Sequence, residues 1–117
     1  MSAIYNFSPQ VPGNTFERRI FAIKRIVNGS LITLDGASVV FEVYRPGSDK
    51  IWLTQQMTIL DASECIVMIP EIKNPSLTEF EYNWQCTITY SDGDIKTYLG
   101  GEFPVRRIKT ETKWPIQ

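Results

Sequence analysis

The carboxylates of Asp92 and Asp94, on either side of Gly93, are the first groups in the sequence whose spacing suggests chemistry. Alternating acidic oxygens occur in calcium loops, but the later ligands of such a loop are absent here, so a hairpin turn is the favoured interpretation. Glu79 and Glu81 share one face of a predicted strand. That face is polar, whereas a glycosidase pair needs one carboxyl in an apolar pocket that raises its pKa. Neither pair therefore predicts a metal site or a catalytic site.

The other residue types that serve in catalysis are scarce. The chain contains no histidine, which removes the usual general base, the common Ser-His-Asp arrangement and most zinc sites. It also has no glycine-rich phosphate loop. Cys65 and Cys86 lie within apolar segments, and we expect two small buried hydrophobes rather than a disulfide. The sequence predicts no enzyme activity and no cofactor.

The elements that would position any functional surface belong to one domain. With 117 residues, 43% hydrophobic and 21% charged, the chain fits a single globular domain over 1–117. We expect its core within 4–108 and a loose tail over 109–117. No apolar run approaches the roughly 20 residues that cross a bilayer, and the first residues do not resemble a signal peptide. These patterns predict a protein of a reducing cytoplasm without a membrane partner.

The segment 80–90 has the clearest pattern in the chain. Its apolar residues fall on one parity and its polar residues on the other, which predicts a strand with one buried face. Trp84 lies in the middle of the apolar face and is predicted to be a central core residue. The Asp-Gly pair after this strand predicts a tight hairpin turn in which Gly93 has a positive φ.

The predicted return strand has two parts, 95–99 and 102–105, separated by Gly100 and Gly101. Paired glycines within a strand suggest a bulge or a bend. Pro104 cannot donate a ladder hydrogen bond, so we expect it at an edge or a bulge.

Earlier β-like segments complete the fold prediction. They lie over 15–26, 30–34, 38–45, 51–57 and 65–69. Within 51–57, the shared parity of Ile51, Leu53 and Met57 predicts a common buried face. No stretch shows a sustained helical period with caps. About eight short strands with turn signals between them favour an all-β fold, an antiparallel immunoglobulin-like β-sandwich, with a barrel as the alternative.

Basic residues concentrate near the two ends of the chain. Arg18 and Arg19 belong to one basic segment, and Arg106 and Arg107 belong to another. If the first and last long strands lie side by side, these four arginines form a basic strip. Like charges opposed across a ladder are destabilising, so such a strip would suit an acidic partner, for example the acidic middle of a second copy. The alternative is that the arginines are simply solvated.

The order of short motifs resembles a family of small phage and prophage structural proteins. The same order is similar to the N-terminal domain of some phage baseplate upper proteins. The motifs that carry the resemblance are Gly13-Asn14-Thr15-Phe16, Leu34-Asp35-Gly36-Ala37, the strand 38–45, Tyr82-Asn83-Trp84, Ser91-Asp92-Gly93 and Gly101-Glu102-Phe103-Pro104-Val105.

The resemblance implies a non-catalytic sandwich that assembles into a tail, neck or baseplate. Its expected partners are other virion proteins and a second copy of the chain, with nucleic acid disfavoured. Its expected location is the host cytoplasm during assembly and then the virion. The alternative function is a carbohydrate-binding module for a host-surface glycan, because aromatic residues are abundant and the positions of Trp52, Tyr98 and Trp114 are not explained by a core pattern.

Overall fold

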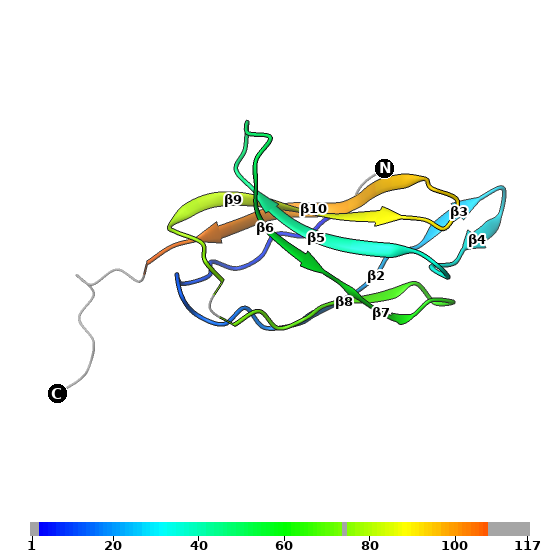
Figure 1. The fold of residues 1–117 in the computed structure, drawn as a ribbon, viewed down its shortest axis with the longest axis horizontal. Coiled ribbons are helices and arrows are strands. Elements are labelled where there is room, and N and C mark those ends of the chain that lie inside the picture. The colour runs from blue at the N-terminus through cyan, green and yellow to red at the C-terminus, as the bar shows by residue number, and fades with distance from the viewer. Residues whose placement is uncertain (1–2, 74, 108–117) are drawn as a thin grey trace.

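A computed structural model describes residues 3–73 and 75–107, and every regular element in these ranges is a β-strand. Two sheets form the layers of a sandwich, and a separate two-stranded hairpin lies at one end (Figure 1). The all-β sandwich predicted from the alternating segments is confirmed. The predicted loose tail at 109–117, which includes Trp114, lies outside the described residues.

The larger sheet has five strands in the order β1-β10-β9-β5-β6. Their bounds are β1 Ala3–Ile4, β10 Ile95–Val105, β9 Phe80–Thr89, β5 Ser38–Tyr44 and β6 Ile51–Gln56. The alternation in β9 buries Tyr82, Trp84 and Cys86, as predicted, and Trp84 is only 1% exposed. Phe80 departs from the pattern, being 38% exposed at the start of the strand.

The smaller sheet has the order β2-β8-β7 and faces the larger one across the core. Its strands are β2 Arg19–Ala22, β8 Ile66–Ile69 and β7 Thr58–Asp61, and the separate hairpin comprises β3 Arg25–Val27 and β4 Ser30–Ile32. The apolar run of β8 buries Val67 and Ile69 at the centre of the molecule. The chain passes from one sheet to the other between β6 and β7, at the buried Met57.

Residues 3–10 cover one edge of the larger sheet. β1 pairs with β10 in parallel, and the amides of Tyr5 and Phe7 then donate to the carbonyls of Gly100 and Glu102. The ring of Phe7 is buried among those of the core, 5.0 Å from the ring of Trp84. The N-terminal segment therefore contributes Phe7 to the core, whereas Ile4 and Tyr5 are exposed.

Gly100 and Gly101 lie in regular register with β9, so the bulge predicted at these residues is wrong. The register shifts instead between Thr97 and Leu99. A Cβ on Gly101 would collide with the carbonyl of Tyr5, and a Cβ on Gly100 would lie 2.7 Å from the carbonyl oxygen of Trp84. These glycines therefore allow neighbouring backbone to approach β10 closely.

Pro104 lies within β10, and its carbonyl accepts from the amide of Gln10. The amide that proline lacks would point to the same side, toward the N-terminal segment and away from β9. The N-terminal segment covers that side through the amides of Tyr5, Phe7 and Gln10, and no register shift lies at Pro104, so the expected edge or bulge is wrong. Proline is tolerated because its nitrogen faces this irregular segment instead of a regular strand.

Two other predictions need correction. The segment 15–26 is not one long strand, because β2 ends at Ala22 and β3 turns away to pair with β4. Ile51 does not share the buried face of Met57, because a register shift in β6 separates them and leaves Ile51 37% exposed. The short strands β1 and β7 had no recognisable sequence signal.

Candidate functional site

The predicted basic strip depended on pairing between the first and last long strands. Arg19 starts β2, which pairs with β8 in the smaller sheet. Arg106 follows β10, whose neighbours in the larger sheet are β1 and β9. The two basic segments are therefore not opposed across a ladder, and that premise is wrong.

Three of the four arginines meet partners within their own chain. Arg106 donates from Nε and Nη2 to the two carboxylate oxygens of Glu81, at 2.9 and 2.7 Å. This bidentate bond lowers the pKa of Glu81 below its ordinary value. Arg107 pairs with Glu79 at 3.6 Å, so Glu79 and Glu81, the two carboxylates considered and set aside in the sequence, are counter-ions of these arginines.

Arg19 is partnered by main chain and aromatic rings. Its Nη1 donates to the carbonyls of Glu17 and Arg18, and its guanidinium lies 4.9 Å from the centroid of the Phe16 ring. Arg18 is exposed. A role of these arginines in assembly stays a prediction.

A second cluster of cations, which sequence reasoning did not find, surrounds Trp52. The guanidinium carbon of Arg45 lies 4.1 Å from the ring centroid of Trp52 and 4.1 Å from that of Phe80. The Lys50 ammonium lies 4.3 Å from the Trp52 centroid. We call these four residues the Arg45 cluster. Arginine held against two aromatic rings is a planar donor fork whose orientation is already fixed.

A β-bulge positions the tryptophan of this cluster. Along β6, Leu53 pairs with Val43 but Ile51 pairs with Tyr44, which leaves Trp52 as the extra residue. The bulge lets Trp52 turn toward the core, where its ring lies 6.5 Å from that of Tyr82. The bulge had no sequence signal.

The Arg45 cluster has unused donors. Arg45 Nε and Trp52 Nε1 are both buried and have no acceptor among the described residues. The ion pairs within 3–73 and 75–107 involve neither Arg45 nor Lys50. Positive charge and buried N–H groups therefore gather at one corner of the larger sheet, with no counter-ion from residues 3–73 and 75–107.

Apolar side chains are exposed on the β3–β4 hairpin, which lies at one end of the sandwich. Ile26 and Leu31 pair across β3 and β4, and Ile26 is 68% exposed. Ile95, 64% exposed, follows the β9–β10 turn at the same end (Figure 1). We call the β3–β4 hairpin the hairpin arm. Its Asn28 and Gly29 have φ of 52° and 78°, as expected for the tight turn that joins its strands.

Polar contacts hold the base of the hairpin arm. Arg25 pairs with Asp94 at 3.4 Å and lies 4.9 Å from the centroid of the Tyr90 ring. On the other side, Cys65 Sγ donates to the carbonyl of Ile32, and the Cys65 carbonyl accepts from the amide of Ile23. The arm is thus attached to both layers.

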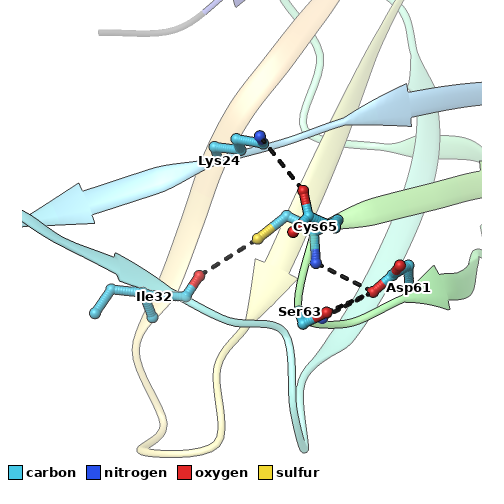
Figure 2. A network of polar contacts seen from close by, with 6 residues as sticks. Lys24, Ile32, Asp61, Ser63 and Cys65 are labelled. Atoms are coloured by element: carbon cyan, nitrogen blue, oxygen red, sulfur yellow. Dashed lines mark hydrogen bonds and ion pairs between the residues drawn. The ribbon is translucent and has the colours of Figure 1, made fainter.

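The turn between β7 and β8 supports this base (Figure 2). The Asp61 carboxylate accepts from the Ser63 hydroxyl at 2.8 Å and from the amides of Ser63 and Glu64, both at 3.1 Å. Lys24 lies 3.9 Å from the Glu64 carboxylate. Cys65 is buried with φ 59°, and burial raises the pKa of its thiol. A buried, protonated thiol is a poor nucleophile.

Three aromatic residues were considered for glycan binding in the sequence: Trp52, Tyr98 and Trp114. Trp52 is half-buried with Arg45 and Lys50 lying over its ring, so it does not offer a free aromatic face. Tyr98 is half-buried beside a hollow between β1 and the end of β2, and Trp114 lies outside the described residues.

A different tyrosine lies on the outer face of the larger sheet. Tyr44 borders two shallow hollows, one with Asn83 and Glu102 and the other with Gln85 and Asp49. The amide and carboxylate groups beside this half-buried ring resemble the polar and aromatic mixture that binds sugars.

No protein-family model and no curated protein matches the sequence. Within the described ranges, no three cysteine or acidic residues are grouped so that they could hold a metal ion. The same ranges contain no helix long and apolar enough to span a membrane.

Proposed function

We propose that the chain is a non-catalytic structural protein of a phage or prophage virion, which acts through protein–protein contacts in a tail, neck or baseplate. The motif order that resembles small phage structural proteins supports this assignment. An antiparallel sandwich provides a rigid support for such contacts, and an immunoglobulin-like arrangement of its strands is part of the proposal.

The observation that carries this proposal is the hairpin arm. Ile26, Leu31 and Ile95 are exposed at the end of the molecule where the arm is attached. A soluble monomer gains no stability from apolar side chains that project into water, whereas a partner would bury them. Anchoring by Arg25 and Cys65 holds the arm in place before a partner binds, which reduces the entropy lost on association.

Mass spectrometry of gradient-purified particles tests the proposal. We expect the protein to co-migrate with particles, and Ile26→Ser to reduce its incorporation several-fold while the isolated domain stays folded. Ile20→Ser is the matched control, because Ile20 is 54% exposed but lies on β2, away from the arm. Detection in infected lysate but never in particles would refute the proposal.

A second candidate function, glycan binding, is favoured by the outer face around Tyr44. Its ring would stack against a sugar while Asn83, Gln85 and Glu102 offer hydrogen bonds. A glycan array followed by titration tests this candidate. We expect Tyr44→Ala to abolish any binding that Tyr98→Ala leaves unchanged. An array without a single bound glycan would remove the candidate.

A further inference from the structure

We infer that the free edge of β6 binds an extended acidic segment of a partner protein, which adds a strand to the larger sheet and places a carboxylate against Arg45 and Lys50. This inference rests on the proposed assembly function. It names a second surface, distinct from the hairpin arm, and the chemistry of the partner that fits it.

The first observation is the edge itself. β6 is the last strand of the five-stranded sheet and pairs only with β5 among the described residues. The Met57 amide donates to the carbonyl of Val39, so by alternation the backbone groups of Thr54 and Gln56 point away from β5. The sequence from Ile51 to Gln56 contains neither proline nor a charged residue. This edge therefore lacks the proline and the charged residues that often prevent strand addition. Its bulge lies at Trp52, near the start of the strand, and the Gln56 carbonyl accepts from Gln55 Nε2, so Thr54 offers the open backbone groups in the regular part of the edge.

The second observation is unpaired positive charge at the beginning of that edge. Arg45 is held between the rings of Trp52 and Phe80, and no described carboxylate pairs with it or with Lys50. The buried Nε of Arg45 and Nε1 of Trp52 also have no acceptor in the part of the chain that the structure describes. A carboxylate from a partner would supply both the counter-charge and acceptor oxygens.

The residue types agree with an interface. Arginine and tryptophan are enriched among the residues that dominate binding energy, especially where surrounding groups exclude water. Here the Trp52 ring is half-buried, and Ile51 and Phe80 beside it are exposed. A strand bound along β6 would cover Ile51 as well as the donors.

A second copy of the chain fits this edge less well. Antiparallel pairing of two β6 strands around a two-fold axis places the Lys50 end of one against the Gln56 end of the other. The residues at that end, 54–58, include no carboxylate. Charge complementarity therefore favours a different, acidic chain.

A peptide pair tests the inference with the full chain. The probe is a capped eight-residue peptide of alternating threonine and valine that ends in two glutamates, and its control ends in two glutamines. At low salt we expect the glutamate peptide to bind about tenfold more tightly, with the difference decreasing as salt rises. Equal affinity of the two peptides, or no binding of either, would overturn the inference.

Matched variants locate the bound peptide. Thr54→Pro removes an outward amide without removing a bond to β5, and we expect it to abolish binding, whereas Thr54→Val should not. Lys50→Gln and Arg45→Lys should each weaken binding several-fold, because arginine provides a planar fork that lysine lacks. Lys96→Gln is the charge control on β10. Binding that survives Thr54→Pro in a folded protein would refute strand addition.

Two further measurements separate this inference from the proposed function. Sedimentation of the isolated chain shows whether it self-associates. If the chain forms a dimer that Thr54→Pro dissociates, and the two peptides bind equally, the partner at this edge is a second copy and the acidic partner is rejected. Particle incorporation is then measured for Thr54→Pro and Thr54→Val. Normal incorporation of both variants would reject this edge while the assembly function stands, whereas absence of the wild-type protein from particles would reject the function.

Discussion

The indole N–H of Trp84 donates a hydrogen bond of 2.8 Å to the main-chain carbonyl of Tyr5, although 79 positions separate the two residues in the chain. The bond joins the middle of β9 to the N-terminal segment that covers β10. Because the Trp84 ring is buried, its N–H needs a protein partner, and the first residues of the chain provide it.

The first prediction concerns Trp84. Trp84→Ala should lower the free energy of unfolding by about 3–5 kcal/mol, because it opens a large cavity in the core. Trp84→Phe retains most of the buried ring but loses the bond to Tyr5, so its loss should be smaller. Urea denaturation gives both values. A loss below about 1 kcal/mol for the alanine variant would contradict the central role of this side chain.

The second prediction concerns the contact between Gly101 and the N-terminal segment. Gly101→Ala introduces a Cβ into the carbonyl of Tyr5, so the segment must move, at an expected cost of about 1–3 kcal/mol. Hydrogen exchange should show reduced protection of the Phe7 amide. Gly47→Ala is the control: its Cβ meets no atom within 4 Å, although φ is +80°. Unchanged Phe7 protection in Gly101→Ala would show that the close approach is not needed.

The sequence predicted the elements whose signals are local. Strict alternation located β9, and the Asp-Gly pair located a turn whose glycine has a positive φ. Burial of Trp84 followed from parity alone. These features depend on a residue and its near neighbours, which is the information that a periodic pattern contains.

The features that sequence reasoning missed depend on pairing between distant segments. β1 has two residues and no pattern of its own, so only its partner β10 defines it. The bulge at Trp52 arises from the register of β6 against β5. Without that register, Arg45 and Trp52 could not be placed together, and the Arg45 cluster could not be predicted. The pairing assumed for the basic strip was wrong for the same reason, because the neighbours of β2 and β10 are set by distant segments.

The third prediction concerns the turn at Gly93, where φ is +94°. Gly93→Val should destabilise the domain by about 1–2 kcal/mol, because a β-branched residue resists this conformation. No atom lies within 4 Å of the added Cβ, so the effect isolates backbone strain from crowding. Gly93→Asn should be tolerated better, and thermal unfolding compares the two. Equal stability of the valine variant and the wild type would refute the strain.

The fourth prediction concerns Asp61. Hydrogen bonds from the Ser63 hydroxyl and the Glu64 amide lower the pKa of Asp61 below its ordinary value of 3.8. The folded state therefore binds this proton less readily than the unfolded state, so the contribution to stability is present above the unfolded pKa and is lost as pH falls through the folded pKa. Carbon-detected NMR should show the low pKa directly. Ser63→Ala should raise it, and an unchanged value would refute the capping role of the hydroxyl.

The last prediction concerns the thiol of Cys86. Burial, with a smaller contribution from the charge of Glu42, raises the pKa of Cys86 to about 12. At pH 8 only about one molecule in ten thousand would carry the reactive thiolate in the folded state. In a Cys65→Ala variant, we therefore expect a disulfide reagent to label Cys86 only as fast as the domain opens. Moderate urea should accelerate labelling in parallel with unfolding measured by tryptophan fluorescence. Rapid labelling of the folded variant without urea would show that the space between the sheets is open to solvent beside Cys86.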